Sequence, residues 1–130
     1  LELRAFISKS SFFKVIEDEE TKVAGFMIVL GPGTDYSSEN YQYFDSRYSS
    51  FDYIDRIVIS ENFRNLGFGT ALYQFLIAHT NEASITCEVN IVPPNPVSAK
   101  FHKRLGFTEM HRMKVNNGTK EVSLLAKEFI

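Results

Sequence analysis

Short apolar runs that predict β-strands recur through the chain. Most are rich in β-branched and aromatic residues and are bounded by turn-forming residues. In the clearest run, apolar Ile85, Cys87 and Val89 alternate with polar Thr86 and Glu88, as on the two faces of a strand. The predicted strands cover 12–16, 22–30, 53–59, 84–92, 107–115 and 122–129.

The segment after the strand at 53–59 has the spacing of an amphipathic helix. Its apolar residues recur three and four positions apart, which predicts a helix that ends near Thr80. Because this helix joins the strand at 53–59 to the strand at 84–92, those two strands are expected to be parallel. The stripe consists of Phe68, Leu72, Phe75, Leu76 and His79.

A second short helix is predicted after the strand at 84–92. Asn95 stands before Pro96, an arrangement typical of an N-cap followed by the first helical position. Gly106 is typical of the helix end. The last two strands flank Asn116-Asn117-Gly118, whose Asn-Gly step indicates a tight hairpin turn.

Two charged residues, Asp55 and Arg56, lie inside a strand that should be largely buried. Buried charges are costly unless they are paired, so these two predict either a structural ion pair or a role in a site. Strict alternation puts Asp55, Ile57 and Ile59 on one face of this strand, and Ile54, Arg56 and Val58 on the other.

The segment from Thr34 to Ser50 is both aromatic and polar and has no clean period. Two interpretations stay open: a loop with a short helix packed over the sheet edge, or the wall of a substrate pocket. In the second interpretation Tyr41 and Tyr43 are candidate substrate-binding residues.

Composition narrows the class of protein. The chain has 130 residues, enough for one domain with a core and too few for two. A net charge of −2 excludes a broad surface for nucleic acid or an anionic membrane. No apolar run approaches the ~18 residues of a membrane span, and no secretory signal is visible. Cys87 is the only cysteine; it excludes a disulfide framework, fits a reducing, cytoplasmic compartment, and is expected to be inert and buried.

The turn before the first helix has the chemistry of a phosphate site. Its sequence is Arg64-Asn65-Leu66-Gly67-Phe68-Gly69-Thr70. The first N–H groups of a helix lack partners and carry partial positive charge, so they favour an anion. The two glycines allow a bulky anion to approach the backbone, and Arg64 adds a fixed positive charge. A glycine-containing turn that binds nothing is the alternative interpretation.

This turn resembles the Gln/Arg-x-x-Gly-x-Gly/Ala motif of the GNAT N-acyltransferase superfamily, with Arg64, Gly67 and Gly69 at the three defined positions. A second motif of that superfamily, Asn-x-x-Ala/Ser-x-x-Leu/Phe-Tyr-x-x-x-Gly-Phe, is matched at its spacing. The matching residues are Asn95, Ser98, Phe101, His102 (in place of tyrosine), Gly106 and Phe107. More narrowly, the second half resembles a bacterial-type group of uncharacterised acetyltransferases.

The resemblance implies an α+β fold with a mixed, mostly antiparallel sheet flanked by helices, in a single domain over 1–130. Its two parallel strands would splay into a V that admits the pantetheine arm of acetyl-CoA. The strand and helices that open this superfamily's fold are expected to be incomplete, because little sequence precedes Phe12.

The resemblance also implies acetyl-CoA as cosubstrate, no metal, and direct attack by an amine of a small molecule or protein. The 64–70 turn would hold the pyrophosphate, and Ile57, Val58 and Ile59 would bind pantetheine through their backbone. The facing helix would contribute Asn95, Ser98, Phe101 and His102, with Lys100, Lys103 or Arg104 near the adenosine phosphates. The sequence is compatible with a homodimer as well as with a monomer.

Proton transfer is assigned to three residues. His102 occupies the position of the tyrosine that protonates the departing thiolate, and an imidazole can donate a proton near neutrality. Glu88 is the first choice of general base and Asp55 the second, and both are candidate acceptor contacts together with Asn90. Structural roles for these carboxylates, and simple packing of His102 beside CoA, are the alternatives.

Overall fold

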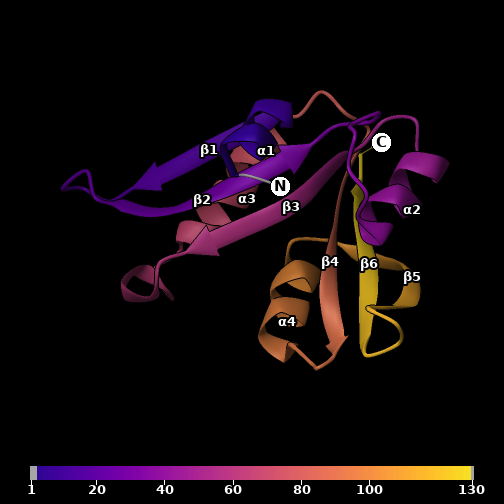
Figure 1. Cartoon of the computed structure of the whole chain (residues 1–130). Helices are drawn as coiled ribbons and strands as arrows, with labels where there is room; N and C mark the ends of the chain where they lie inside the picture. Colours follow the sequence, from indigo (N-terminus) through magenta and orange to yellow (C-terminus); the bar gives the residue numbers. More distant parts are fainter. Residues whose placement is uncertain (1–2, 130) are drawn as a thin grey trace.

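The computed structural model describes residues 3–129, which form one six-stranded sheet flanked by four α-helices. The strand order is β1-β2-β3-β4-β6-β5, and every neighbouring pair is antiparallel except β3 and β4. The expected mixed, mostly antiparallel sheet is therefore confirmed (Figure 1). The elements are α1 (Leu3–Lys9), β1 (Phe12–Glu17), β2 (Val23–Leu30), α2 (Glu39–Arg47), β3 (Asp52–Ile59), a 3₁₀ turn (Glu61–Phe63), α3 (Phe68–His79), β4 (Ser84–Val92), α4 (Pro96–Arg104), β5 (Thr108–Val115) and β6 (Lys120–Glu128).

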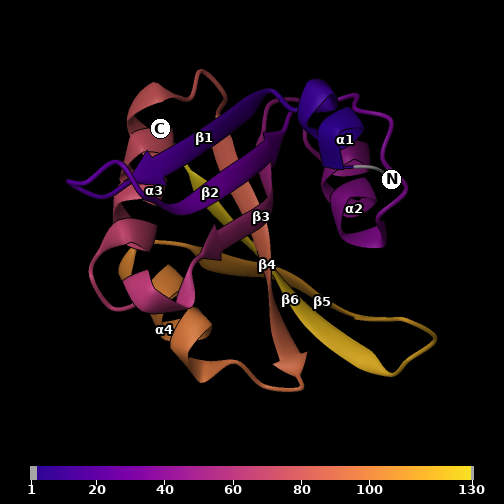
Figure 2. The ribbon, with the colours of Figure 1, turned by 60° about the vertical axis from the view of Figure 1, so that its left-hand side comes forward.

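Strands β3 and β4 pair over a very short length. Only two residue pairs join them, Asp52 with Ile85 and Tyr53 with Thr86, after which the strands diverge. Figure 2 shows the resulting V, with α4 near its open end. The predicted splay between these two strands is confirmed.

A β-bulge interrupts β3 at Asp55. Ile28 of β2 pairs with Arg56, whereas the next residue, Val29, pairs with Ile54, so Asp55 is the extra residue. A bulge shifts the alternation of side chains by one position. The predicted division of this strand into two faces is therefore wrong: Ile54 packs in the same core cluster as Ile57 and Ile59.

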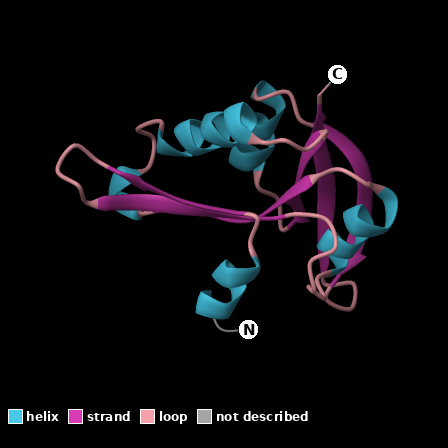
Figure 3. Ribbon diagram, turned by 90° about the horizontal axis from the view of Figure 1, so that it is seen from above, coloured by secondary structure: helices cyan, strands magenta, loops and turns pink. Residues whose placement is uncertain are grey.

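One core cluster lies on each face of the sheet. The first packs Leu72, Tyr73 and Leu76 of α3 against the sheet, and Cys87 is buried in it as expected. The second gathers Phe6 of α1 with residues of α2, β3 and β6. Seen from above, α1 and α3 lie on opposite sides of the N-terminal strands (Figure 3).

Local sequence signals determine where the two helices that border the V begin. Gly67 caps α3 with a φ of 86°, in the left-handed region that glycine adopts without strain. At α4 the Asn95 side chain accepts a hydrogen bond from the Ser98 backbone N–H at 3.1 Å, and Pro96 is the first helical residue. Both predicted helix starts are confirmed.

Candidate active site

A cavity of about 910 Å³ lies at the N-terminus of α3, between the end of β3 and α4. Ala71 is the first residue of α3 whose N–H bonds back to the capping Gly67, at 3.0 Å. The preceding N–H groups therefore lack intrahelical partners, as an anion site requires. The cavity brings together nine residues predicted from the sequence: Ile57, Val58, Ile59, Arg64, Asn65, Gly67, Phe68, Gly69 and Thr70.

Helix α4 forms the facing wall of this cavity. Phe101 lines it as predicted, and Arg104 brings a positive charge. Sequence reasoning missed Phe63, Val97 and Leu105, which complete the apolar wall; apolar residues at a helix edge carry no distinguishing signal. Leu66, by contrast, is 65% exposed and does not line the cavity.

A second cavity, of about 310 Å³, occupies the V itself and is called here the splay cavity. It brings together the three candidate proton-transfer residues, Asp55, Glu88 and His102, although they come from β3, β4 and α4. Ser98 and Tyr73 also line it. Tyr73 was missed from the sequence, where it sits beside the apolar stripe of α3 with nothing to mark it.

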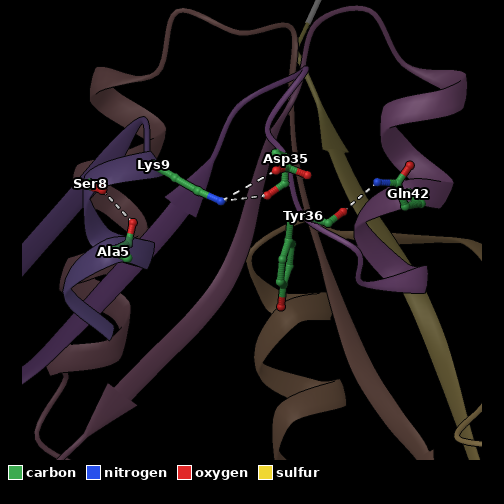
Figure 4. Close-up of polar contacts among 6 residues, drawn as sticks. All are labelled: Ala5, Ser8, Lys9, Asp35, Tyr36 and Gln42. Carbon is green, nitrogen blue, oxygen red and sulfur yellow. Dashed lines mark hydrogen bonds and ion pairs between the residues drawn. The ribbon is translucent and has the colours of Figure 1, made fainter. Parts of the chain in front are cut away.

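Asp55 is held by neighbours on two sides. Arg56 donates from Nε to its Oδ2 at 3.2 Å, and the Asp55 side chain is only 7% exposed. Burial and the nearby Asp55 carboxylate raise the pKa of Tyr36. Figure 4 shows how Tyr36 is fixed: Gln42 of α2 donates to its carbonyl at 2.6 Å, while Lys9 of α1 reaches Asp35. Asp55 is therefore ion-paired, the structural alternative, and also lies at the cavity.

Glu88 is the carboxylate with the properties of a general base. Tyr53 donates from its hydroxyl to Glu88 Oε2 at 3.1 Å, which leaves the other oxygen, Oε1, free of hydrogen bonds within residues 3–129. Burial raises the pKa of Glu88 above its ordinary 4.5, against opposing effects of Tyr53 and Lys120. A base with a raised pKa binds a proton more readily in the transition state.

Both ring nitrogens of His102 are already hydrogen-bonded. Nδ1 lies 2.8 Å from the Ser98 carbonyl oxygen, and Nε2 lies 2.6 Å from the Tyr73 hydroxyl. Because a carbonyl only accepts, the neutral ring carries its proton on Nδ1, and Nε2 accepts from Tyr73. Burial lowers the pKa of His102 below 6.5. The ring is therefore a proton donor toward the cavity only when it is protonated and acts through Tyr73.

Four further predicted residues lie away from both cavities. Tyr41 is fully buried, and its hydroxyl donates to the Gly31 carbonyl at 2.6 Å. Tyr43 stacks on His111 with ring centroids 4.8 Å apart. These two residues pack α2 onto the sheet, so the structure does not bring them to a cavity wall. The Asn95 side chain is engaged as the cap of α4, and Asn90 borders a neighbouring cavity next to Glu88.

The comparisons with known proteins agree with this geometry. The family model described as the Acetyltransferase (GNAT) family matches residues 2–107. The chain belongs to the GNAT acetyltransferase family. No curated protein sequence matches this GNAT chain.

Solved structures of N-acetyltransferases share the fold of this GNAT chain. The ribosomal-protein-S18-alanine N-acetyltransferase from Escherichia coli superposes with a TM-score of 0.70 at 16% identity, over 98% of this chain and 77% of that one. The spermidine/spermine N-acetyltransferase SpeG from Vibrio cholerae gives 0.63 at 17% identity, over 89% of this chain and 64% of that one. The chain thus spans somewhat less than two thirds of SpeG.

Residues 3–129 contain neither a cluster of metal ligands nor a membrane-spanning helix. No group of three or more His, Cys, Asp or Glu side chains in this part of the GNAT chain is arranged to hold a metal ion. None of its helices there has the length and apolar character that crossing a bilayer requires.

Proposed function

We propose that this GNAT protein transfers the acetyl group of acetyl-CoA directly to a primary amine of a small molecule or a protein. The observation that carries the proposal is the continuity of the site. An anion-binding helix N-terminus opens the 910 Å³ cavity, Ile57 and Val58 line both cavities, and the splay cavity holds the proton-transfer residues. The structural relatives act on amines of a ribosomal protein and of spermidine, which supports an amine acceptor.

In the proposed reaction the amine nitrogen attacks the thioester carbon, and the carbonyl electrons move to oxygen. The backbone N–H groups of β3 beyond Tyr53 that point away from β2 have no partner on β4 and are available to the oxyanion. When the carbonyl re-forms, the C–S bond breaks and its electron pair leaves with sulfur. Glu88 takes the proton from the new ammonium nitrogen.

The thiolate then takes a proton from the Tyr73 hydroxyl, and Tyr73 recovers it from Nε2 of protonated His102. This relay uses the 2.6 Å contact between the two side chains. It keeps the acid role of His102 and adds Tyr73 as the group that delivers the proton. Solvent exchange returns Glu88 and His102 to their starting states.

A second candidate function is an acyl-CoA-binding or sensor module with little catalytic activity. The engagement of both His102 nitrogens and the lowered pKa of this residue favour it. Thiol release from acetyl-CoA, measured with a panel of primary amines, separates the two. Turnover of any amine supports the transferase, whereas CoA binding without turnover of any amine supports the sensor.

Charge introduced at Gly69 is expected to weaken CoA binding. A Cβ built at Gly69 lies 3.9 Å from Ile59 Cγ1 and 4.0 Å from Phe101 Cζ, so the site has room for a small side chain. Gly69→Asp should then fold and repel the pyrophosphate at the helix N-terminus. Calorimetry should show CoA affinity reduced by about five- to thirtyfold, given an electrostatic effect of ~1–2 kcal/mol.

Gly69→Ala is the matched control, because it adds the Cβ without the charge. Equal losses in both variants would indicate a steric effect, and unchanged affinity in folded Gly69→Asp would place the phosphates elsewhere.

A further inference from the structure

A cavity of about 540 Å³ lies between α4 and the strands β4, β5 and β6, and is called here the α4 cavity. Ala99 and Lys103 stand one turn apart on α4 and line it. It shares no lining residue with the 910 Å³ cavity or with the splay cavity, which border other faces of the same helix. Its volume falls within the ~300–1,000 Å³ typical of small-molecule sites, so this separate space can hold a ligand of its own.

The floor of the α4 cavity is apolar. It is formed by side chains of β4 and β6 and by the second residue after the end of α4's C-cap, namely Val89, Ile91, Leu125 and Phe107. These side chains carry no hydrogen-bonding group, so the floor favours an apolar ligand surface over water. The polar groups of a ligand must therefore find partners on the surrounding walls.

The one carboxylate on those walls is already satisfied. Arg112 donates from Nε to both oxygens of Glu109 at 2.9 Å, and the Ser123 hydroxyl donates to Oε2 at 2.5 Å. The hydrogen bond from Ser123, together with Arg112, lowers the pKa of Glu109 below its ordinary 4.5. Glu109 is therefore ionised at neutral pH, and the charge of Arg112 balances it.

Lys103 adds a positive charge without an acidic partner. It forms no salt bridge among residues 3–129, and in that part of the chain Arg112 uses only its Nε, which leaves its terminal nitrogens free. Two cations thus face one carboxylate, an excess of one positive charge. A ligand carboxylate suits guanidinium and ammonium donors, whereas a ligand ammonium would be repelled by both.

We propose that the α4 cavity binds a small monocarboxylic acid with an apolar body. The carboxylate lies at Lys103 and the free nitrogens of Arg112, and the apolar body covers Phe107 and Leu125. Because the α4 cavity shares no lining residue with the 910 Å³ cavity, the acid and CoA can be bound at the same time. This site is additional to acetyl transfer and does not depend on it.

The test uses phenylacetate as the probe, with phenylacetamide and benzyltrimethylammonium as its neutral and cationic counterparts. Binding of each is measured by NMR titration, in the protein alone and with saturating CoA. Phenylacetate, a ligand of about ten heavy atoms, should bind with a Kd of about 1 mM, and CoA should not change this value. Phenylacetamide should bind about two- to fivefold more weakly, as expected from the loss of an exposed ion pair, and benzyltrimethylammonium more weakly still.

Three variants locate the bound acid. Lys103→Met should weaken phenylacetate binding by about two- to fivefold and leave phenylacetamide binding unchanged. Ala99→Trp fills the space beside the floor and should weaken binding of both ligands at least about tenfold. Lys114→Met removes an exposed lysine of β5 that does not line the cavity, and it should leave both affinities unchanged.

Equal Kd values for phenylacetate and phenylacetamide, or no saturable binding of phenylacetate well above the expected Kd, would overturn the proposal. Displacement of phenylacetate by CoA, or its loss in Gly69→Asp, would also overturn it, because either result places the acid in the 910 Å³ cavity. Thermal unfolding verifies that the variants fold. If Ala99→Trp fails to fold, the surface substitution Lys103→Met decides, and an unchanged phenylacetate affinity in that variant rejects the site.

Discussion

Replacing Glu88 by Gln is expected to lower kcat by ~10²–10⁴-fold while the affinity for CoA is kept. The carboxamide has nearly the shape of the carboxylate and still accepts a hydrogen bond from Tyr53, but it cannot take a proton. Glu88 is absent from the lining of the 910 Å³ cavity, so cofactor binding should be unaffected. Steady-state kinetics together with calorimetry for CoA measure both effects.

The pH dependence gives an independent check on Glu88. The base must be ionised, and burial raises its pKa above 4.5, so the acid limb of kcat should lie above that value in the wild type. It should disappear in Glu88→Gln. Glu17→Gln, on the exposed edge strand β1, is the control. If Glu88→Gln retains the full rate, Glu88 is not the general base, and that role belongs to Asp55 or to a water held by backbone groups.

Breaking the contact between Tyr73 and His102 should produce the second large effect. Tyr73→Phe removes the hydroxyl that delivers the proton, and His102→Phe removes its source. Each should reduce kcat by ~10²-fold or more with CoA affinity little changed. Each also leaves a buried polar group unpaired, so the free energy of unfolding should fall by about 1–3 kcal/mol.

The pH profile distinguishes the relay from simple packing. Protonated His102 is the proton source, and its population falls as pH rises through a pKa that burial places below 6.5. The alkaline limb of kcat is therefore expected below pH 6.5. In His102→Tyr it should move toward ~10, the ordinary pKa of a phenol. Full kcat in His102→Phe or in Tyr73→Phe would exclude the relay and leave the pair a structural one.

The parts of the site with local sequence signals were predictable. The 64–70 turn and the cap at Asn95 each depend on backbone geometry that a few neighbouring residues determine, so the starts of α3 and α4 follow from the sequence. The two matched motifs identified the family because their order and spacing are jointly specific. The splay followed from the family resemblance.

The parts that depend on contacts distant in sequence were not predictable. The bulge at Asp55 exists because of the register with β2, which no residue of β3 reveals by itself. The hydrogen bond between Tyr73 and His102 joins two helices through residues that are 29 positions apart in the sequence. Tyr41 and Tyr43 have the composition of a binding wall, yet the fold uses them to pack α2.

Because β3 and β4 pair over so short a length, a small rotation at their junction changes the width of the cleft between them. Asp52 and Tyr53 join two stiff halves of the sheet, and the buried Asp52 also accepts hydrogen bonds from Ser11 and Thr80. From Tyr53 to Ile59 the strand extends ~20 Å at ~3.3 Å per residue. A rotation of ~5° about this junction moves the far end of β3 by ~2 Å. A misplacement of only ~1 Å can cost a catalytic site ~10²-fold in rate. The width of the cleft is thus set at its narrow end, by side chains that line neither the 910 Å³ cavity nor the splay cavity.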